Sequence, residues 1–146
     1  MAERQHAPVE QTGKANILIV DDRPEKRLVF QAILEDLRQN LITANSGEEA
    51  LKQVLERDFA VILLDVNMPG LDGLETAALI RSRRRSAHVP IIAVTAKAMK
   101  GDREKCMEAG AWDYLSKPVD TDLMVGTLRA WLAAGRRLEP TLFGHA

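Results

Sequence analysis

The sequence predicts an α/β fold in which one parallel sheet is covered by helices on both faces. Short apolar runs alternate along the chain with longer amphipathic segments, which is the arrangement of βαβ units. The central run, Ala60 to Leu64, contains no polar residue, as expected for a strand buried on both faces. It is followed by Asp65 and then by the turn-forming segment 68–73, so a carboxylate is expected at the end of a buried strand.

Polar side chains also follow other strands of the predicted sheet. The five strands are expected at residues 17–20, 41–44, 60–64, 90–94 and 112–116. Asp21 and Asp22 follow the first strand, Asp65 the third, Thr95 the fourth and Lys117 the fifth. Ligands in open parallel sheets bind beyond the carboxyl ends of the strands. We therefore expect three carboxylates, one hydroxyl and one ammonium group at one edge of the sheet.

The first two segments between strands have the periodicity and caps of helices. Pro24 suits the first turn of a helix over residues 24–37. Its apolar face is expected to consist of Leu28, Ala32, Leu34 and Leu37. The sequence from Ser46 to Glu49 has the form of a capping box, in which Ser46 caps a helix that runs to about residue 56 and Glu49 reaches back.

Three further helices follow at similar spacing. They are expected at about residues 74–84, 98–109 and 121–134. Gly110 and Gly135 are placed to stop the last two of these helices, and Asp120 is placed to cap the final one. Strands and helices that alternate in this way form right-handed crossovers between parallel strands.

Taken together, these motifs resemble the receiver domain of bacterial two-component response regulators. The matching segments are Asp21-Asp22, Asp65 with Met68-Pro69 and Asp72-Gly73, Thr95-Ala96, and Lys117-Pro118. The resemblance extends from about residue 16 to residue 135, and the joint order of the motifs makes it specific. It implies a flavodoxin-like (βα)5 fold, with a doubly wound five-stranded parallel sheet in the order 2-1-3-4-5.

The predicted carboxylate cluster favours a metal ion. Asp21, Asp22 and Asp65 repel one another when they are brought together, which favours protonation or the binding of a cation. Oxygen ligands without histidine or cysteine favour Mg²⁺. The resemblance implies that Asp22, Asp65 and the backbone carbonyl of Asn67 bind the metal directly, and that Asp21 acts through water.

The resemblance also implies the chemistry of the site. Asp65 is expected to accept a phosphoryl group from a phosphohistidine on a histidine kinase or a histidine phosphotransfer protein, which gives an aspartyl phosphate. Lys117 neutralises negative charge on the phosphoryl oxygens. Pro118 suggests a cis peptide bond between the two residues, which would direct the Lys117 side chain toward the site. Thr95 offers a hydroxyl group to the phosphoryl group. The domain would catalyse only its own phosphorylation and dephosphorylation, and is not expected to be an enzyme in any other sense.

A signalling switch is implied at Tyr114, which lies three positions before Lys117. Thr95 would move toward the phosphoryl group and let Tyr114 turn inward, reshaping the face formed by the fourth helix, the fifth strand and the fifth helix. This face would control an unknown downstream protein or relay the phosphoryl group onward. Asn67 and Lys97 occupy positions that tune the lifetime of the phosphoryl group in this family.

One domain is predicted, with residues 1–14 as a disordered leader, 15–136 as the receiver domain and 137–146 as a tail, and no output domain. Twenty basic residues nearly balance 21 acidic residues, which gives no reason to expect binding to nucleic acid or membranes. The absence of a signal peptide and of an apolar span, together with the lone Cys106, predicts a cytoplasmic protein. Both a monomer and a phosphorylation-dependent dimer are compatible with the sequence, as are a stand-alone regulator and a domain of a hybrid histidine kinase.

The sequence leaves three alternatives. The first is a phosphate-independent interaction module with the same fold, against which the retained Asp22, Asp65, Thr95 and Lys117 argue. The second, a flavodoxin, is disfavoured because carboxylates follow the first strand where a phosphate-binding loop is needed. The third, an aspartate-based phosphatase, is disfavoured because Asn67 replaces the second aspartate of the nucleophile pair.

Overall fold

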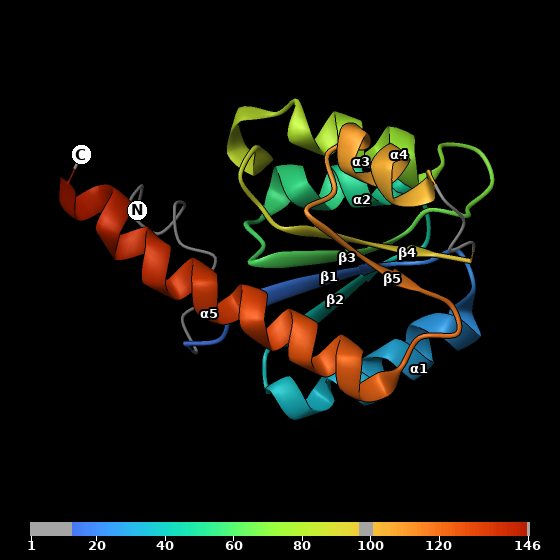
Figure 1. Cartoon of the computed structure of the whole chain (residues 1–146), viewed down its shortest axis with the longest axis horizontal. Helices are drawn as coiled ribbons and strands as arrows, with labels where there is room; N and C mark the ends of the chain where they lie inside the picture. Colours follow the sequence, from blue (N-terminus) through green and yellow to red (C-terminus); the bar gives the residue numbers. More distant parts are fainter. Residues whose placement is uncertain (1–12, 97–100, 146) are drawn as a thin grey trace.

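The computed structural model describes residues 13–96 and 101–145, and these form a five-stranded parallel sheet between two layers of helices (Figure 1). The strands are β1 (Asn16–Val20), β2 (Asn40–Ala44), β3 (Val61–Asp65), β4 (Ile91–Thr95) and β5 (Asp113–Ser116). The helices are α1 (Pro24–Leu34), α2 (Gly47–Glu56), α3 (Gly73–Arg81), α4 (Asp102–Ala109) and α5 (Thr121–His145). Short 3-10 helices, η2 (Glu35–Leu37) and η3 (Arg84–Ser86), follow α1 and α3.

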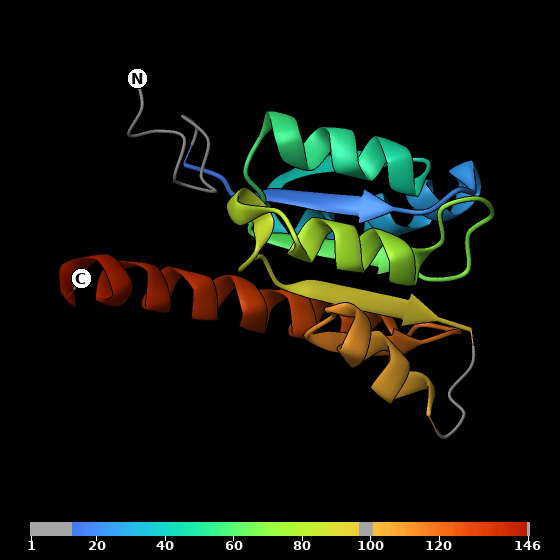
Figure 2. The same ribbon diagram turned by 90° about the horizontal axis from the view of Figure 1, so that it is seen from above.

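The strand order is β2-β1-β3-β4-β5, with every pair parallel, which confirms the predicted fold. Helices α1 and α5 cover one face of the sheet, and α2, α3 and α4 cover the other (Figures 1 and 2). Alternate residues of each central strand enter opposite cores. In β1, for example, Ile17 and Ile19 pack beneath α1 and α5, whereas Leu18 and Val20 pack on the other side.

For the first helix, the predicted last residue was wrong, and so was part of the predicted buried face. Helix α1 ends at Leu34, and residues 35–37 tighten into η2. Phe30 and Leu34 form its buried face, while 67% of Leu28 is exposed. Leu28 lies two residues before Phe30, and because successive helical residues are about 100° apart, Leu28 points away from the sheet.

The prediction for the last helix was also wrong in its length. It was expected to end at Ala134, but α5 continues through Gly135 to His145, into the segment predicted as a tail. Glycine lowers helix propensity by only about 1 kcal/mol, so a single one does not end a helix with good helix formers on both sides. The second half of α5 continues past the sheet (Figure 2).

Most predicted caps are present. Ser46 Oγ accepts the N–H of Glu49 at 3.0 Å, although the Glu49 carboxylate accepts the N–H of Asn45 and not that of Ser46. Asp120 Oδ1 accepts the N–H of Leu123 at 2.9 Å, and Gly110 ends α4 with a φ of 118°.

The predicted leader falls almost entirely on residues 1–12, outside the described residues, as does the predicted start of the fourth helix. Within the described residues no helix combines the length and apolarity needed to cross a membrane.

An aromatic cluster ties α5 to the rest of the domain at the end of the sheet where β5 begins. The ring centroids of Trp112 and Trp131 are 5.7 Å apart, and the central carbon of the Arg81 guanidinium lies 4.7 Å from the centroid of the Trp112 ring. Trp131 Nε1 also donates a hydrogen bond of 3.1 Å to Asp113 Oδ2. These contacts join α3, the start of β5 and α5 one helical turn before α5 leaves the core.

Candidate functional site

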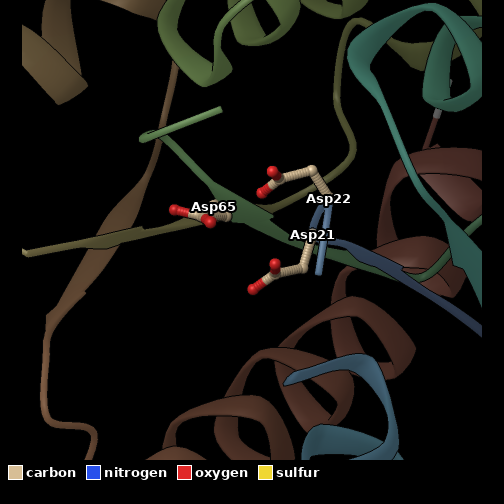
Figure 3. A group of neighbouring side chains, drawn as sticks. All are labelled: Asp21, Asp22 and Asp65. Carbon is tan, nitrogen blue, oxygen red and sulfur yellow. The ribbon is translucent and has the colours of Figure 1, made fainter. Parts of the chain in front are cut away.

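Three carboxylates meet at the carboxyl edge of the sheet (Figure 3). Asp21 and Asp22 directly follow β1, and Asp65 is the last residue of β3. One ligand atom from each residue lies within 4.8 Å of the other two. The structure therefore brings together the three acidic residues that were predicted to form a metal site.

The sheet register explains why the carboxylates meet. Strands β1 and β3 are parallel neighbours, and Val20 pairs with Leu64, so Asp21 and Asp65 extend from adjacent strands at the same level. Both side chains are buried, with 0% and 1% of their surface exposed. Two buried apolar strands thus hold the carboxylates at their ends in the protein interior.

The backbone around Asp21 is held by α1. The N–H of Arg23 donates to Asp21 Oδ1 at 2.9 Å, and Arg27 Nη1 donates to the Asp21 carbonyl oxygen at 2.7 Å. The N–H of Asp21 in turn donates to the carbonyl of Ala44 in β2 at 3.1 Å. These bonds fix the loop that presents both Asp21 and Asp22.

Lys117 reaches Asp65 from the end of β5. Its Nζ lies 3.0 Å from Asp65 Oδ1, and the backbone N–H of Asn67 donates to the same oxygen at 2.9 Å. The Lys117–Pro118 peptide bond is cis, as predicted. One oxygen of the Asp65 carboxylate, Oδ1, is therefore held by two donors, and the other, Oδ2, is buried without a hydrogen-bond partner among the described residues.

Burial dominates the electrostatics of Asp21. It raises the pKa of the Asp21 carboxyl group, and the nearby charge of Asp65 adds to this effect. The hydrogen bond from the N–H of Arg23 acts in the opposite direction, as do the charges of Lys117 and Arg23. Repulsion between carboxylates, on which the sequence argument relied, is therefore the smaller of the two causes that raise the pKa.

The open carboxylate oxygens fit a bound cation. Asp21 Oδ2 and Asp65 Oδ2 are buried and have no hydrogen-bond partner within the described residues. A buried acceptor without a donor is costly, and a metal ion removes that cost. A set of oxygen atoms without histidine or cysteine fits Mg²⁺.

Thr95 and Tyr114 lie on the neighbouring strands. Thr95 is buried at the end of β4, where it pairs with Ser116 of β5. Tyr114 is partly buried and packs against the core beneath α2, α3 and α4. The predicted switch residues are thus on adjacent strands, whereas Lys97 lies outside the described residues.

Two features of the site were missed by the sequence analysis. The side chain of Asn67 bridges to the next strand end, because Asn67 Oδ1 accepts the N–H of Ala96 at 3.0 Å. Gly73, interpreted only as a turn residue, lies against the backbone of Asp65 and Val66, where a Cβ atom would overlap both. Asp72 does form the ordinary helix cap expected of it, in a capping box with Glu75.

Residues 17–129 match the family profile of the response regulator receiver domain. The chain belongs to this family. The predicted resemblance is therefore confirmed, and the protein is a signalling domain of the kind found in two-component and phosphorelay systems.

Curated relatives of this receiver domain include both large kinases and small regulators. The signal transduction histidine-protein kinase BarA of Escherichia coli K12 is 38% identical over 106 residues, which cover 73% of this chain and 12% of that protein. The polar-differentiation response regulator DivK of Brucella ovis is 33% identical over 117 residues, which cover 80% of this chain and 95% of that protein. The chain thus spans only a small part of one relative and nearly the whole of the other.

Solved receiver structures have the same fold. The receiver domain of the sensor histidine kinase PA1611 from Pseudomonas aeruginosa PAO1 superposes with a TM-score of 0.76 at 35% identity, over 82% of this chain and 98% of that chain. That structure has a magnesium ion in its active-site cleft. The chemotaxis response regulator CheY4 of Vibrio cholerae superposes with a TM-score of 0.76 at 30% identity, over 81% of this chain and 98% of that chain.

Proposed function

We propose that this receiver domain accepts a phosphoryl group on Asp65 from a phosphohistidine of a histidine kinase or a histidine phosphotransfer protein. The observation that carries the proposal is the unequal environment of the two Asp65 oxygens. Oδ1 is held by Lys117 and by the N–H of Asn67, whereas Oδ2 is buried without a partner among the described residues, in a carboxylate that lies beside those of Asp21 and Asp22. The Asp65 carboxylate is therefore fixed in direction and keeps lone pairs that no donor of the described residues occupies, as a nucleophile requires.

The transfer needs no other covalent participant from the protein. A lone pair of the Asp65 carboxylate forms the new oxygen–phosphorus bond while the phosphorus–nitrogen bond of the donor breaks, and the electron pair of that bond leaves with the imidazole. Lys117, already 3.0 Å from Oδ1, neutralises charge on the phosphoryl oxygens, and the Thr95 hydroxyl donates a hydrogen bond to one of them. Asp22, Asp65 and the carbonyl of Asn67 would hold Mg²⁺ directly, and Asp21 would act through water. With Mg²⁺ held by these residues, the negative charge of the carboxylates would be screened from the incoming phosphoryl group.

The phosphorylated state would be read on the face formed by α4, β5 and α5. Thr95 and Tyr114 lie on the paired strands β4 and β5, with Tyr114 partly buried against the core. Movement of Thr95 toward the phosphoryl group opens space for Tyr114 to turn further inward, which changes the surface offered to a downstream protein or to a second copy of the chain.

The donor would dock beside α1 and α5. Both helices begin at the edge of the sheet that carries the carboxylates, and they pack against each other on one face (Figure 1). Leu28 of α1 is 67% exposed and Leu123 of α5 is 58% exposed, within the first two turns of their helices. Apolar side chains exposed beside a reactive group suit a transient protein partner, and the proposal places this encounter in the cytoplasm.

Intact mass spectrometry tests the proposal directly. Incubation with acetyl phosphate and Mg²⁺ should add one phosphoryl group to the wild type, and neither Asp65→Asn nor an EDTA-treated sample should gain it. If the wild type stays unmodified, the same measurement with a phosphorylated histidine phosphotransfer domain follows. Failure with both donors would contradict the proposal and favour a phosphate-independent interaction module.

A further inference from the structure

The side chain of Asn67 lies between the ends of β3 and β4. Its backbone N–H donates to Asp65 Oδ1 at 2.9 Å, and its side-chain Oδ1 accepts the backbone N–H of Ala96 at 3.0 Å. Asn67 and Ala96 are exposed, so neither bond is enforced by burial of these residues in the core. This bridge connects the proposed acceptor residue to the strand end that carries Thr95.

The backbone donors at this edge differ in how easily they become available. Those that directly follow β3, β4 and β5 belong to Val66, Asn67, Ala96 and Lys117. The N–H of Val66 and that of Lys117 donate to carbonyl oxygens of neighbouring strands, at 3.0 and 2.7 Å. Releasing either one would break a backbone bond between paired strands, which is costly in a buried sheet.

The other two donors are held by side chains. The N–H of Asn67 is already directed at Asp65, where a phosphoryl group would form. The N–H of Ala96 is held by the Asn67 amide, which rotation about side-chain bonds can remove without moving the backbone. A phosphoryl group brings several strong acceptor oxygens, and oriented backbone N–H groups are good partners for them.

From this geometry we infer that the Asn67 side chain is a latch that occupies the N–H of Ala96 in the resting state and must release it when Asp65 is phosphorylated. The inference rests on the proposed function, because it names a regulator of that same site. The latch opposes the phosphorylated arrangement by the strength of one hydrogen bond. Asn67 is accordingly a positioning residue whose amide sets the balance between the held and the released N–H of Ala96.

The test compares Asn67→Ala with the wild type in titrations with beryllofluoride, a stable mimic of the acyl phosphate, in excess Mg²⁺, followed by calorimetry. Removal of the latch should tighten binding about two- to tenfold, the factor that one net hydrogen bond supplies. A residue needed only for structure would give weaker binding on truncation. Asn45→Ala is the matched control, because Asn45 is an exposed asparagine just after β2, and its substitution should leave the affinity unchanged.

Amide hydrogen exchange at Ala96 gives a second readout that needs no ligand. The N–H of Ala96 should exchange faster in Asn67→Ala than in the wild type, and Asn45→Ala should leave it unaltered. Equal exchange rates at Ala96, or wild-type binding with no gain in Asn67→Ala, would overturn the latch alone. Absence of beryllofluoride binding in both proteins would instead overturn the proposed function, and with it the latch.

Discussion

Asp21 and Asp65 are each satisfied at one oxygen and left open at the other. Asp21 Oδ1 accepts a hydrogen bond from the N–H of Arg23. Asp65 Oδ1 accepts hydrogen bonds from Lys117 Nζ and from the N–H of Asn67. The remaining oxygens are buried without a hydrogen-bond donor among the described residues. This arrangement fixes the direction of both side chains and stores an unfavourable interaction that a cation relieves, which is typical of a functional site.

Replacing Asp21 should therefore stabilise the metal-free protein. In the folded state the pKa of Asp21 is raised above its ordinary value of 3.8, mainly by burial, so the folded state binds more protons than the unfolded chain just above that pH. The free energy of unfolding then falls as the pH rises through the raised pKa. The free energy of unfolding of Asp21→Asn does not fall in this way, because asparagine does not titrate. In EDTA at pH 7 this variant should be more stable than the wild type by about 1 kcal/mol.

Thermal unfolding in EDTA between pH 4 and pH 8 measures this effect. The melting temperature of Asp21→Asn should exceed that of the wild type by about 2–4 °C at pH 7, and the difference should shrink toward pH 4. Mg²⁺ should narrow the difference at pH 7, because it stabilises the wild type more. Asp36→Asn, at an exposed acid in η2, should change stability little. A variant less stable than the wild type in EDTA at pH 7 would contradict the argument.

At the scale of helices and strands, the sequence predicted the structure best where a single pattern, the apolar run of a buried strand, decides the element. The apolar runs and the residues that end them predicted the sheet and brought Asp21, Asp22, Asp65 and Lys117 to one edge, because parallel strands share a direction. The face of α1 was mispredicted because Leu28 and Phe30 offer two competing apolar faces, and only packing against the sheet selects the second. The bond from Ala96 to Asn67 depends on how the residues that directly follow β3 and β4 are placed relative to each other, which no local pattern records.

Gly73 shows how an element can hold the site in place. It is the first residue of α3, and its Cα lies so close to the end of β3 that a Cβ would overlap the backbone of Asp65 and Val66. Because these neighbours are backbone atoms, the overlap cannot be relieved by a side-chain rotation. Gly73→Ala should lower the free energy of unfolding by about 1–3 kcal/mol and displace Asp65.

Denaturant unfolding of Gly73→Ala and Gly126→Ala separates this contact from the general effect of the substitution. Gly126 lies inside α5 with nothing near its missing Cβ, so Gly126→Ala should gain about 0.5–1 kcal/mol from helix propensity. Phosphorylation by acetyl phosphate should slow in Gly73→Ala and stay at the wild-type rate in Gly126→Ala. If Gly73→Ala were as stable and as active as the wild type, α3 would not position Asp65.

At the scale of the whole molecule, the two helical layers differ in their relation to the reactive edge. The layer of α1 and α5 exposes Leu28 and Leu123 close to the helix ends that border the carboxylates, whereas Leu55 is exposed on α2 in the opposite layer. A protein donor must place its phosphohistidine at Asp65 and therefore covers surface around that edge. A small donor such as acetyl phosphate covers none of it.

Leu28→Asp should consequently separate the two kinds of donor. A charge in the centre of a transient apolar contact costs about 1–2 kcal/mol, so transfer from a phosphorylated histidine phosphotransfer domain that is active on the wild type should slow roughly tenfold. Labelling by acetyl phosphate should keep its wild-type rate, because Asp65 and its partners are unchanged. Leu55→Asp, with a side chain 54% exposed on the other layer, should match the wild type with both donors. Equal slowing by Leu55→Asp would show that the donor docks elsewhere, and slower labelling by acetyl phosphate in Leu28→Asp would show that the substitution disturbs the site itself.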